Sequence, residues 1–148
     1  MRTLIHASLI AAVLATPFAM AQESSPVGLW KTIDDTSGKP TALIRITEQQ
    51  GELQGKIEKL FRGPNEEQNP KCVQCTDARK DQPIVGMTIV SGLKKTGDEY
   101  TGGEILDPKN GKIYKSKLTV RDGGKKVEVR GFVGVPMFGR SQVWLRQE

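Results

Sequence analysis

Apolar and polar residues alternate through most of the chain that follows its N-terminal apolar stretch. From Gly102 to Arg146 the alternation breaks at Asn110-Gly111 and at residues 122–124, and it resumes after each break. Successive side chains of a strand point to opposite faces, and Asn-Gly and Asp-Gly pairs favour tight hairpin turns. This part of the chain therefore predicts antiparallel strands joined by hairpins.

The same alternation predicts about eight short strands and no amphipathic helix. We expect the strands at residues 27–33, 42–47, 53–61, 84–93, 99–106, 112–121, 125–133 and 140–146. Residues 62–83 hold three prolines, both cysteines and no sustained period, which predicts a long loop excursion with room for one short helical turn.

This pattern favours an all-β fold, a single antiparallel up-and-down β-barrel of about eight strands. Such a barrel pairs its first strand with its last and so removes the exposed edges, and its interior holds packed side chains or one small ligand. Several residues that we place inward are small, and they either leave a cavity or allow tight coiling of the strands. These residues are Gly55, Gly103, Ser116 and Gly131.

The N-terminus has the features of a secretory signal peptide. Arg2 precedes an apolar run at residues 4–13, and Ala19-Met20-Ala21 fits the small-x-small cleavage rule, so we expect residues 1–21 to be removed. The run is too short for a transmembrane span, and no cysteine marks a lipid anchor. We expect a periplasmic or secreted barrel domain at residues 22–148 with no transmembrane segment.

Composition excludes several kinds of chemistry from the mature chain. The only histidine is His6, within the predicted signal peptide, so histidine-based nucleophile pairs and metal sites are not expected. The net charge is +5, but the basic residues are dispersed and aromatic residues make up 5%, which argues against nucleic-acid binding. We expect no catalytic residue, no cofactor and no metal; adjacent acids such as Asp34-Asp35 are interpreted as solvated loop groups.

Cys72 and Cys75 are expected to form a disulfide, because an exported protein meets an oxidising compartment. We interpret the bond as a clip on the excursion at residues 62–83. Two other interpretations stay open. A thioredoxin-like redox pair requires a helix that starts at the first cysteine, and a metal site requires two further ligands.

Two further features concern a ligand. Gly28-Leu29-Trp30 resembles the lipocalin signature, in which the tryptophan plugs the closed end and an arginine of the last strand, here Arg140 or Arg146, covers the indole; an ordinary core tryptophan is the alternative. The apolar run at residues 132–138 forms either a lip at a cavity mouth, a lipid or partner surface, or a cap on the core. The candidate ligand-binding residues are Trp30, Tyr114, Met137, Phe138 and Arg140.

Blocks of sequence along nearly the whole mature chain resemble an uncharacterised exported bacterial family, domain of unknown function 2147. The blocks are residues 27–30, 69–75, 82–86, 103–108, 111–114, 131–134 and 139–144. The resemblance implies a lipocalin-like barrel and export, and it brings no ligand or reaction. The leading hypothesis is a binding protein for a small apolar or amphipathic ligand. The alternatives are a module that docks on an envelope protein and a redox protein that uses its two cysteines.

Overall fold

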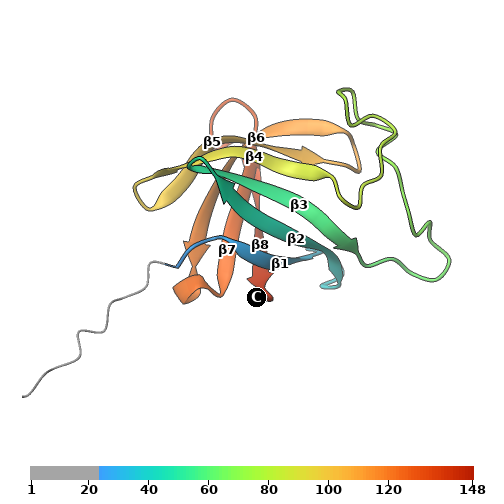
Figure 1. Ribbon diagram of the computed structural model, residues 1–148, viewed down its shortest axis with the longest axis horizontal. Coiled ribbons are helices and arrows are strands. Elements are labelled where there is room, and N and C mark those ends of the chain that lie inside the picture. The colour runs from blue at the N-terminus through green and yellow to red at the C-terminus, as the bar shows by residue number, and fades with distance from the viewer. Residues whose placement is uncertain (1–23) are drawn as a thin grey trace, which may run out of the picture.

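The computed structural model describes residues 24–148, and the predicted signal peptide at residues 1–21 lies outside them. Eight antiparallel strands form one closed barrel in sequence order, which confirms the predicted up-and-down fold (Figure 1). Within residues 24–148 no helix is long and apolar enough to cross a membrane. The strands are β1 (Gly28–Ile33), β2 (Pro40–Gln49), β3 (Glu52–Leu60), β4 (Thr88–Thr96), β5 (Glu99–Asp107), β6 (Lys112–Arg121), β7 (Lys126–Phe132) and β8 (Gly139–Arg146).

Turn residues set most strand ends where the alternation predicts them. β6 spans the predicted residues 112–121, between the Asn110-Gly111 turn and a short 3-10 turn, η1 (Asp122–Gly124). β4 is different, because it begins at Thr88 and not at residue 84. Gly86 adopts a φ of 92°, which an apolar strand residue would not tolerate, and its N–H donates to the Ile57 carbonyl at 2.7 Å.

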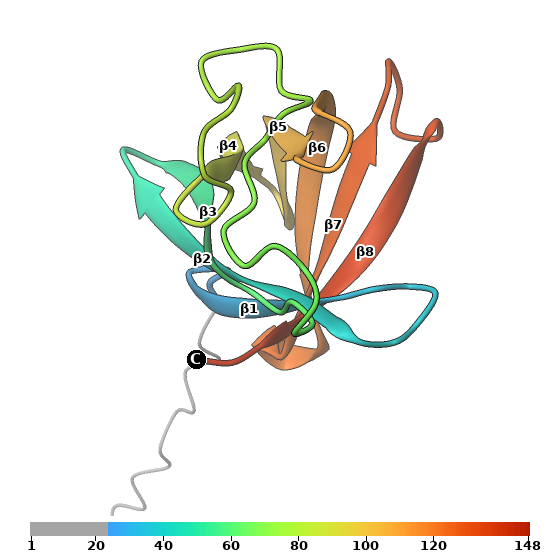
Figure 2. The same ribbon diagram turned by 90° about the vertical axis from the view of Figure 1, so that its right-hand side faces the viewer.

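The segment between β3 and β4 is the predicted excursion. It contains no helical turn, although the sequence allowed one there. Turns and bends replace it, with one isolated bridge between Lys71 and Pro83. Figure 2 shows this segment crossing in front of one end of the barrel.

The first and last strands close the barrel over a short seam. Trp30 pairs with Arg146 and Lys31 with Leu145, and the Gln147 N–H extends the contact to the Leu29 carbonyl at 2.8 Å. Beyond these pairs β1 ends at Ile33, whereas β8 continues back to Gly139. The two strands are therefore joined at one end of the barrel and not at the other.

The core fills the end of the barrel where the seam is paired. Its most deeply buried side chains come from most of the strands: Trp30, Ile46, Leu53, Val90, Leu93, Leu118, Val127 and Trp144. Two of the small inward residues lie here. A Cβ on Gly103 would stand 2.5 Å from the Ser91 oxygen and 2.7 Å from Leu93 Cγ, and one on Gly55 would stand 3.0 Å from Val90 Cβ. At these two positions the small residue allows close packing and leaves no cavity.

Gly103→Ala should destabilise the barrel by about 2 kcal/mol, because the added methyl group has backbone and a buried leucine in its way. Ser116 lies directly opposite Gly103 on β6 and supplies the control. Its buried hydroxyl has no hydrogen-bond partner among residues 24–148, so Ser116→Ala removes an unpaired polar group and should leave the free energy of unfolding unchanged or raise it by about 1 kcal/mol. Urea unfolding followed by circular dichroism measures both; equal losses would contradict this packing.

Candidate ligand cavity

A cavity of about 1000 Å³ occupies the end of the barrel away from the seam. Its mouth is lined by the β1–β2, β3–β4 and β5–β6 connections. The β7–β8 connection lies at the same end of the up-and-down barrel, but only the strand residues on either side of it reach the lining. The volume lies at the upper end of the range that small-molecule sites occupy. The barrel thus has one packed end and one open end.

The deep wall of the cavity is apolar. Its side chains come from alternate positions of the strands: Ala42, Ile44, Ile57, Ile89, Leu106, Val129 and Trp144. The polar groups of the wall are already paired. The Thr32 and Thr41 hydroxyls contact one another, and the Gln142 side-chain oxygen accepts a hydrogen bond from the Trp144 indole N–H at 3.3 Å. A ligand that enters this space therefore meets mainly hydrocarbon and one indole ring.

Charged side chains of both signs surround the mouth. The acids are Asp34, Asp35, Glu66 and Asp107, and the bases are Lys39, Arg62, Lys109 and Arg140. Arg140 of β8 stands 3.6 Å from Asp35 of the β1–β2 loop, where β1 and β8 are no longer paired. Apolar walls below a charged rim suit a molecule with one apolar and one polar end.

Asp34 fixes the β1–β2 loop at the rim. Its carboxylate accepts hydrogen bonds from the backbone N–H groups of Ser37, at 2.7 Å, and Thr36, at 3.0 Å. The N–H and hydroxyl of Ser37 are the largest causes that hold the pKa of Asp34 below its usual value. The carboxylate therefore stabilises the conformation of the β1–β2 loop, and this loop places Asp35 and Lys39 at the mouth.

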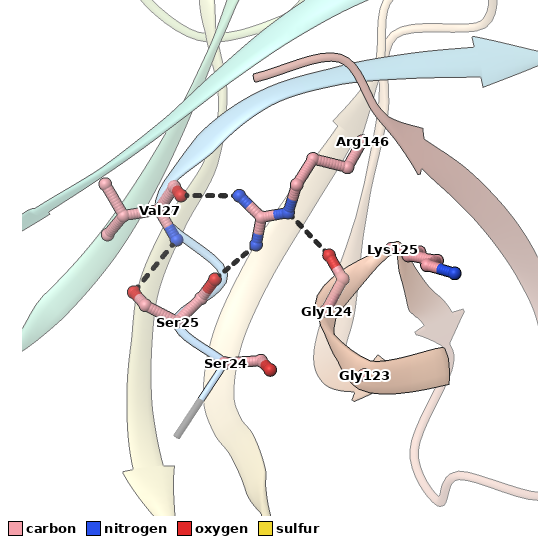
Figure 3. A pocket seen from close by; sticks show the side chains of 7 residues that line it. All are labelled: Ser24, Ser25, Val27, Gly123, Gly124, Lys125 and Arg146. Carbon is pink, nitrogen blue, oxygen red and sulfur yellow. Dashed lines mark hydrogen bonds between the residues drawn. The ribbon is translucent and has the colours of Figure 1, made fainter. Parts of the chain in front are cut away.

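Trp30 closes the other end of the barrel. Its indole is fully buried, and the Nε1–H donates to the Pro26 carbonyl at 2.8 Å. The Arg146 guanidinium carbon lies 4.3 Å from the centre of the ring, so Arg146, not Arg140, covers the tryptophan. Arg146 also donates to the Ser25, Val27 and Gly124 carbonyls, which ties the N-terminal lead-in and η1 to β8 (Figure 3).

A shallow surface pocket surrounds Arg146 on the outside of this closed end. Every nitrogen of the guanidinium group donates to a backbone carbonyl, including the Glu148 carbonyl at 3.1 Å. The arginine is therefore a structural tie, and its hydrogen-bonding capacity is largely used by the chain itself.

The structure separates the five candidate ligand-binding residues. Tyr114 and Arg140 line the cavity, at its upper wall and its rim. Trp30 lies behind the cavity floor. Met137 and Phe138 lie in the β7–β8 loop, exposed and outside the cavity lining. The alternation of the sequence places Ile44, Ile57 and Trp144 inward, but a single sequence does not tell which inward residues border open space.

Gly131 is the small inward residue that does border the cavity. An added Cβ would lie 3.3 Å from the Ile105 side chain, which would have to shift by a few tenths of an ångström, and 3.5 Å from Tyr114 Cβ. Close packing therefore applies to Gly55 and Gly103, whereas Gly131 lies in the cavity wall between Ile105 and Tyr114.

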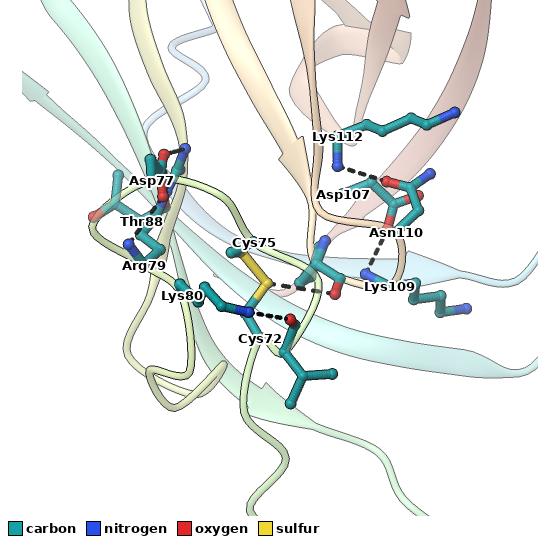
Figure 4. Close-up of a disulfide and its surroundings, with 12 residues drawn as sticks. Cys72, Cys75, Asp77, Arg79, Lys80, Thr88, Asp107, Lys109, Asn110 and Lys112 are labelled. Carbon is teal, nitrogen blue, oxygen red and sulfur yellow. Dashed lines mark hydrogen bonds and ion pairs between the residues drawn. A yellow bond between two sulfur atoms is a disulfide. The ribbon is translucent and has the colours of Figure 1, made fainter.

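The predicted disulfide between Cys72 and Cys75 is confirmed. Both cysteines are buried, and the Cys72 sulfur contacts the Pro108 carbonyl oxygen at 3.6 Å (Figure 4). The loop around the disulfide lies so close to the β5–β6 turn that a Cβ on Gly111 would overlap the Gln74 carbonyl. The bond therefore fixes the local shape of the part of the excursion that packs against the rim of the cavity.

The surroundings of the disulfide favour the interpretation as a clip. Turns and bends follow Cys75, and no helix begins at either cysteine among the residues that the structure describes. In the same part of the chain, no three His, Cys, Asp or Glu side chains gather as metal ligands would. Arg79 donates to the Thr88 carbonyl at 3.0 Å, which anchors the end of the excursion to β4.

The model of the family "Uncharacterized protein conserved in bacteria (DUF2147)" matches residues 28–146. The chain belongs to this family. The resemblance seen in the sequence is thereby confirmed, and the match runs from the first residue of β1 to the last residue of β8.

A solved structure similar to this DUF2147 protein is that of protein HP1028 from the human pathogen Helicobacter pylori, described as belonging to the lipocalin family. The two structures superpose with a TM-score of 0.69 at 16% sequence identity, over 84% of each chain. At this identity the likeness shows the fold, which is a lipocalin-like barrel. No curated protein matches the chain.

Arg146→Ala should lower the free energy of unfolding by roughly 2–4 kcal/mol, because it removes the cover of Trp30 and several charge-assisted hydrogen bonds. Arg146→Lys should recover only part of this loss, since an ammonium cannot stack and donate to several carbonyls at once. Arg140→Ala removes an exposed ion pair and should cost less than about 1 kcal/mol. Urea unfolding of the three variants tests the assignment, which a larger loss for Arg140→Ala would refute.

Proposed function

We propose that this DUF2147 protein is an exported binding protein that holds a small apolar or amphipathic ligand inside its barrel. The observation that carries the proposal is the cavity of about 1000 Å³, which combines apolar walls, one open end and a charged rim. Tyr114 and Arg140 would contact the ligand near the mouth, and Trp144 would contact it at the floor.

The ligand chemistry follows from the depth at which each kind of side chain lies. Charged groups are confined to the connections and strand ends at the mouth, whereas the side chains from the middle of the strands are mainly apolar. Burying an alkyl chain against such a wall is favourable by about 0.8 kcal/mol for each CH₂ group. A carboxylate or other polar head would stay hydrated among Lys39, Lys109 and Arg140 at the rim.

The two tryptophans provide a test with an internal control. Trp144 lines the cavity, whereas Trp30 lies outside it. We expect titration with fatty acids and lipid-like probes to change the fluorescence of the wild type and of Trp30→Phe, with little change in Trp144→Phe. Calorimetry should still detect binding by Trp144→Phe, with a modest loss of affinity, because the phenyl ring keeps much of the apolar contact at the floor.

A substitution that fills the cavity separates binding inside the barrel from binding on its surface. Gly131→Leu places a side chain in the cavity and should weaken binding at least about tenfold, which corresponds to 1.4 kcal/mol. Thr47→Leu adds the same side chain on the exposed outer face of β2 and should leave affinity unchanged. Absence of binding by the wild type, or equal affinities of both variants, would refute a ligand inside the barrel.

Export to the periplasm or the cell exterior is the second part of the proposal. It is supported by the signal-peptide features at residues 1–21 and by the disulfide, which persists in oxidising compartments. Expression of the full chain in a bacterium should yield a protein that begins at Gln22 in the periplasmic or extracellular fraction, as measured by mass spectrometry. Recovery of the uncleaved chain with reduced cysteines would contradict export.

A further inference from the structure

The β7–β8 loop carries the most exposed group of apolar side chains in the part of the chain that the structure describes. The group consists of Val133, Val135, Met137 and Phe138, whose exposed fractions are 66%, 49%, 77% and 68%, and we call it the apolar tip. Exposed apolar side chains that occur singly need no explanation, but a contiguous group marks a contact surface. The interpretation of residues 132–138 as a cap on the core is wrong, because these side chains point to solvent.

The loop is held in this conformation by its own polar groups. Val133 N–H donates to the Phe138 carbonyl, and Phe138 N–H donates to the Val135 carbonyl, both at 3.0 Å. Beneath the loop, the Arg130 guanidinium donates to the Pro136 and Gly139 carbonyls. Much of the polar backbone is thus used internally, and the apolar side chains are presented without a large loss of conformational entropy on contact.

The apolar tip lies beside the mouth of the cavity. Gly131, Arg140 and Gln142, from the strands that carry the loop, all line the cavity. In Figure 2 the loop projects beyond the ends of β7 and β8, at the end of the barrel where residues 62–83 also lie. A surface that contacts the tip therefore also faces the opening.

Charged side chains of both signs surround the base of the tip, and Asp35, Asp107 and Glu104 lie beside the basic residues Arg140, Lys112 and Lys115. Arg130 and Arg140 flank the loop in sequence, Lys115 pairs with Phe132 across the β6–β7 ladder, and Lys112 begins β6 at the same end. Lys112 and Lys115 are exposed and the whole chain carries a net charge of +5. Protruding apolar side chains beside exposed lysines suit an anionic lipid surface, because the apolar side chains enter the interface and the flexible lysines reach the headgroups.

We propose that the apolar tip docks the protein on an anionic lipid bilayer, with Met137 and Phe138 inserted at the interface and the cavity mouth turned toward the membrane. The idea that the cavity then exchanges its ligand with the membrane rests on the proposed function, whereas docking itself does not. The contact is peripheral and reversible, because the inserted apolar area is small and no covalent lipid supports it.

Co-sedimentation of the mature protein with vesicles tests the docking. We expect binding to vesicles of phosphatidylethanolamine with phosphatidylglycerol, and at least tenfold weaker binding to phosphatidylcholine alone or at high salt. The double variant Met137→Ser/Phe138→Ser should lose at least about tenfold in affinity. Lys112→Gln/Lys115→Gln should reduce the preference for anionic lipid without abolishing the effect of the tip.

A matched control removes two other exposed apolar side chains. Val27→Ser/Val143→Ser deletes residues that are 40% and 46% exposed and lie away from the mouth, and it should bind vesicles as the wild type does. Equal losses in the two double variants, or no vesicle binding by the wild type, would overturn the proposal. A wild type that is dimeric by size exclusion, with a monomeric tip variant, would also overturn it and assign the tip to a second copy of the chain.

The fluorescence titration distinguishes this proposal from the proposed function. The tip variant should bind soluble fatty acid in solution as the wild type does, because Met137 and Phe138 lie outside the cavity lining. If the wild type binds fatty acid but no vesicles, the docking proposal alone is refuted. If the wild type binds vesicles but no soluble fatty acid, the proposed cavity ligand alone is refuted.

Discussion

The barrel depends on the stacking of the Arg146 guanidinium on the Trp30 indole, because this contact joins the first strand to the last. The seam between β1 and β8 holds only two paired positions, and Trp30 and Arg146 form one of them. The same arginine is hydrogen-bonded to the lead-in before β1 and to η1 between β6 and β7. One side chain thus compensates for a short backbone ladder and gathers three parts of the chain at the closed end.

The division between a packed and an open end follows from side-chain size and from the register of the strands. Near the seam, large apolar residues interdigitate, and Gly55 and Gly103 allow neighbouring strands to approach. Toward the mouth, Gly131 and Ala42 contribute little volume, and the strands of the seam separate. The cavity arises where inward side chains are too small to meet and where no second tryptophan plug is present.

Local patterning predicted the strands because hairpin registers depend on neighbouring residues. The Asn110-Gly111 turn and the alternation after it placed both ends of β6 correctly. The start of β4 was misplaced because residues 84 and 85 are apolar like a strand, while Gly86 requires a positive φ and Ile84 faces the cavity. Alternation indicates toward which face of the sheet a side chain points, but it does not indicate where the hydrogen-bonded pairing of two strands ends.

The sequence could not choose between Arg140 and Arg146 as the partner of Trp30, because both lie on the same face of the last strand. They are separated by roughly 20 Å along an extended strand, so only the register against β1 decides which one reaches the indole. The same limit applied to Trp144, which alternation placed inward without distinguishing the cavity floor from the packed core. Both positions depend on the register between β1 and β8, which is set only when the barrel closes.

The early end of β1 leaves the outer margin of β8 without a neighbouring strand from Gly139 to about Val143. Such a margin can recruit a strand from another molecule and so promote aggregation. Arg140 places a charge on it, and the charged β1–β2 loop holds Asp35 across from that charge. The ion pair contributes little to folding stability, but its charges make this margin a poor template for intermolecular strand addition while the mouth stays open.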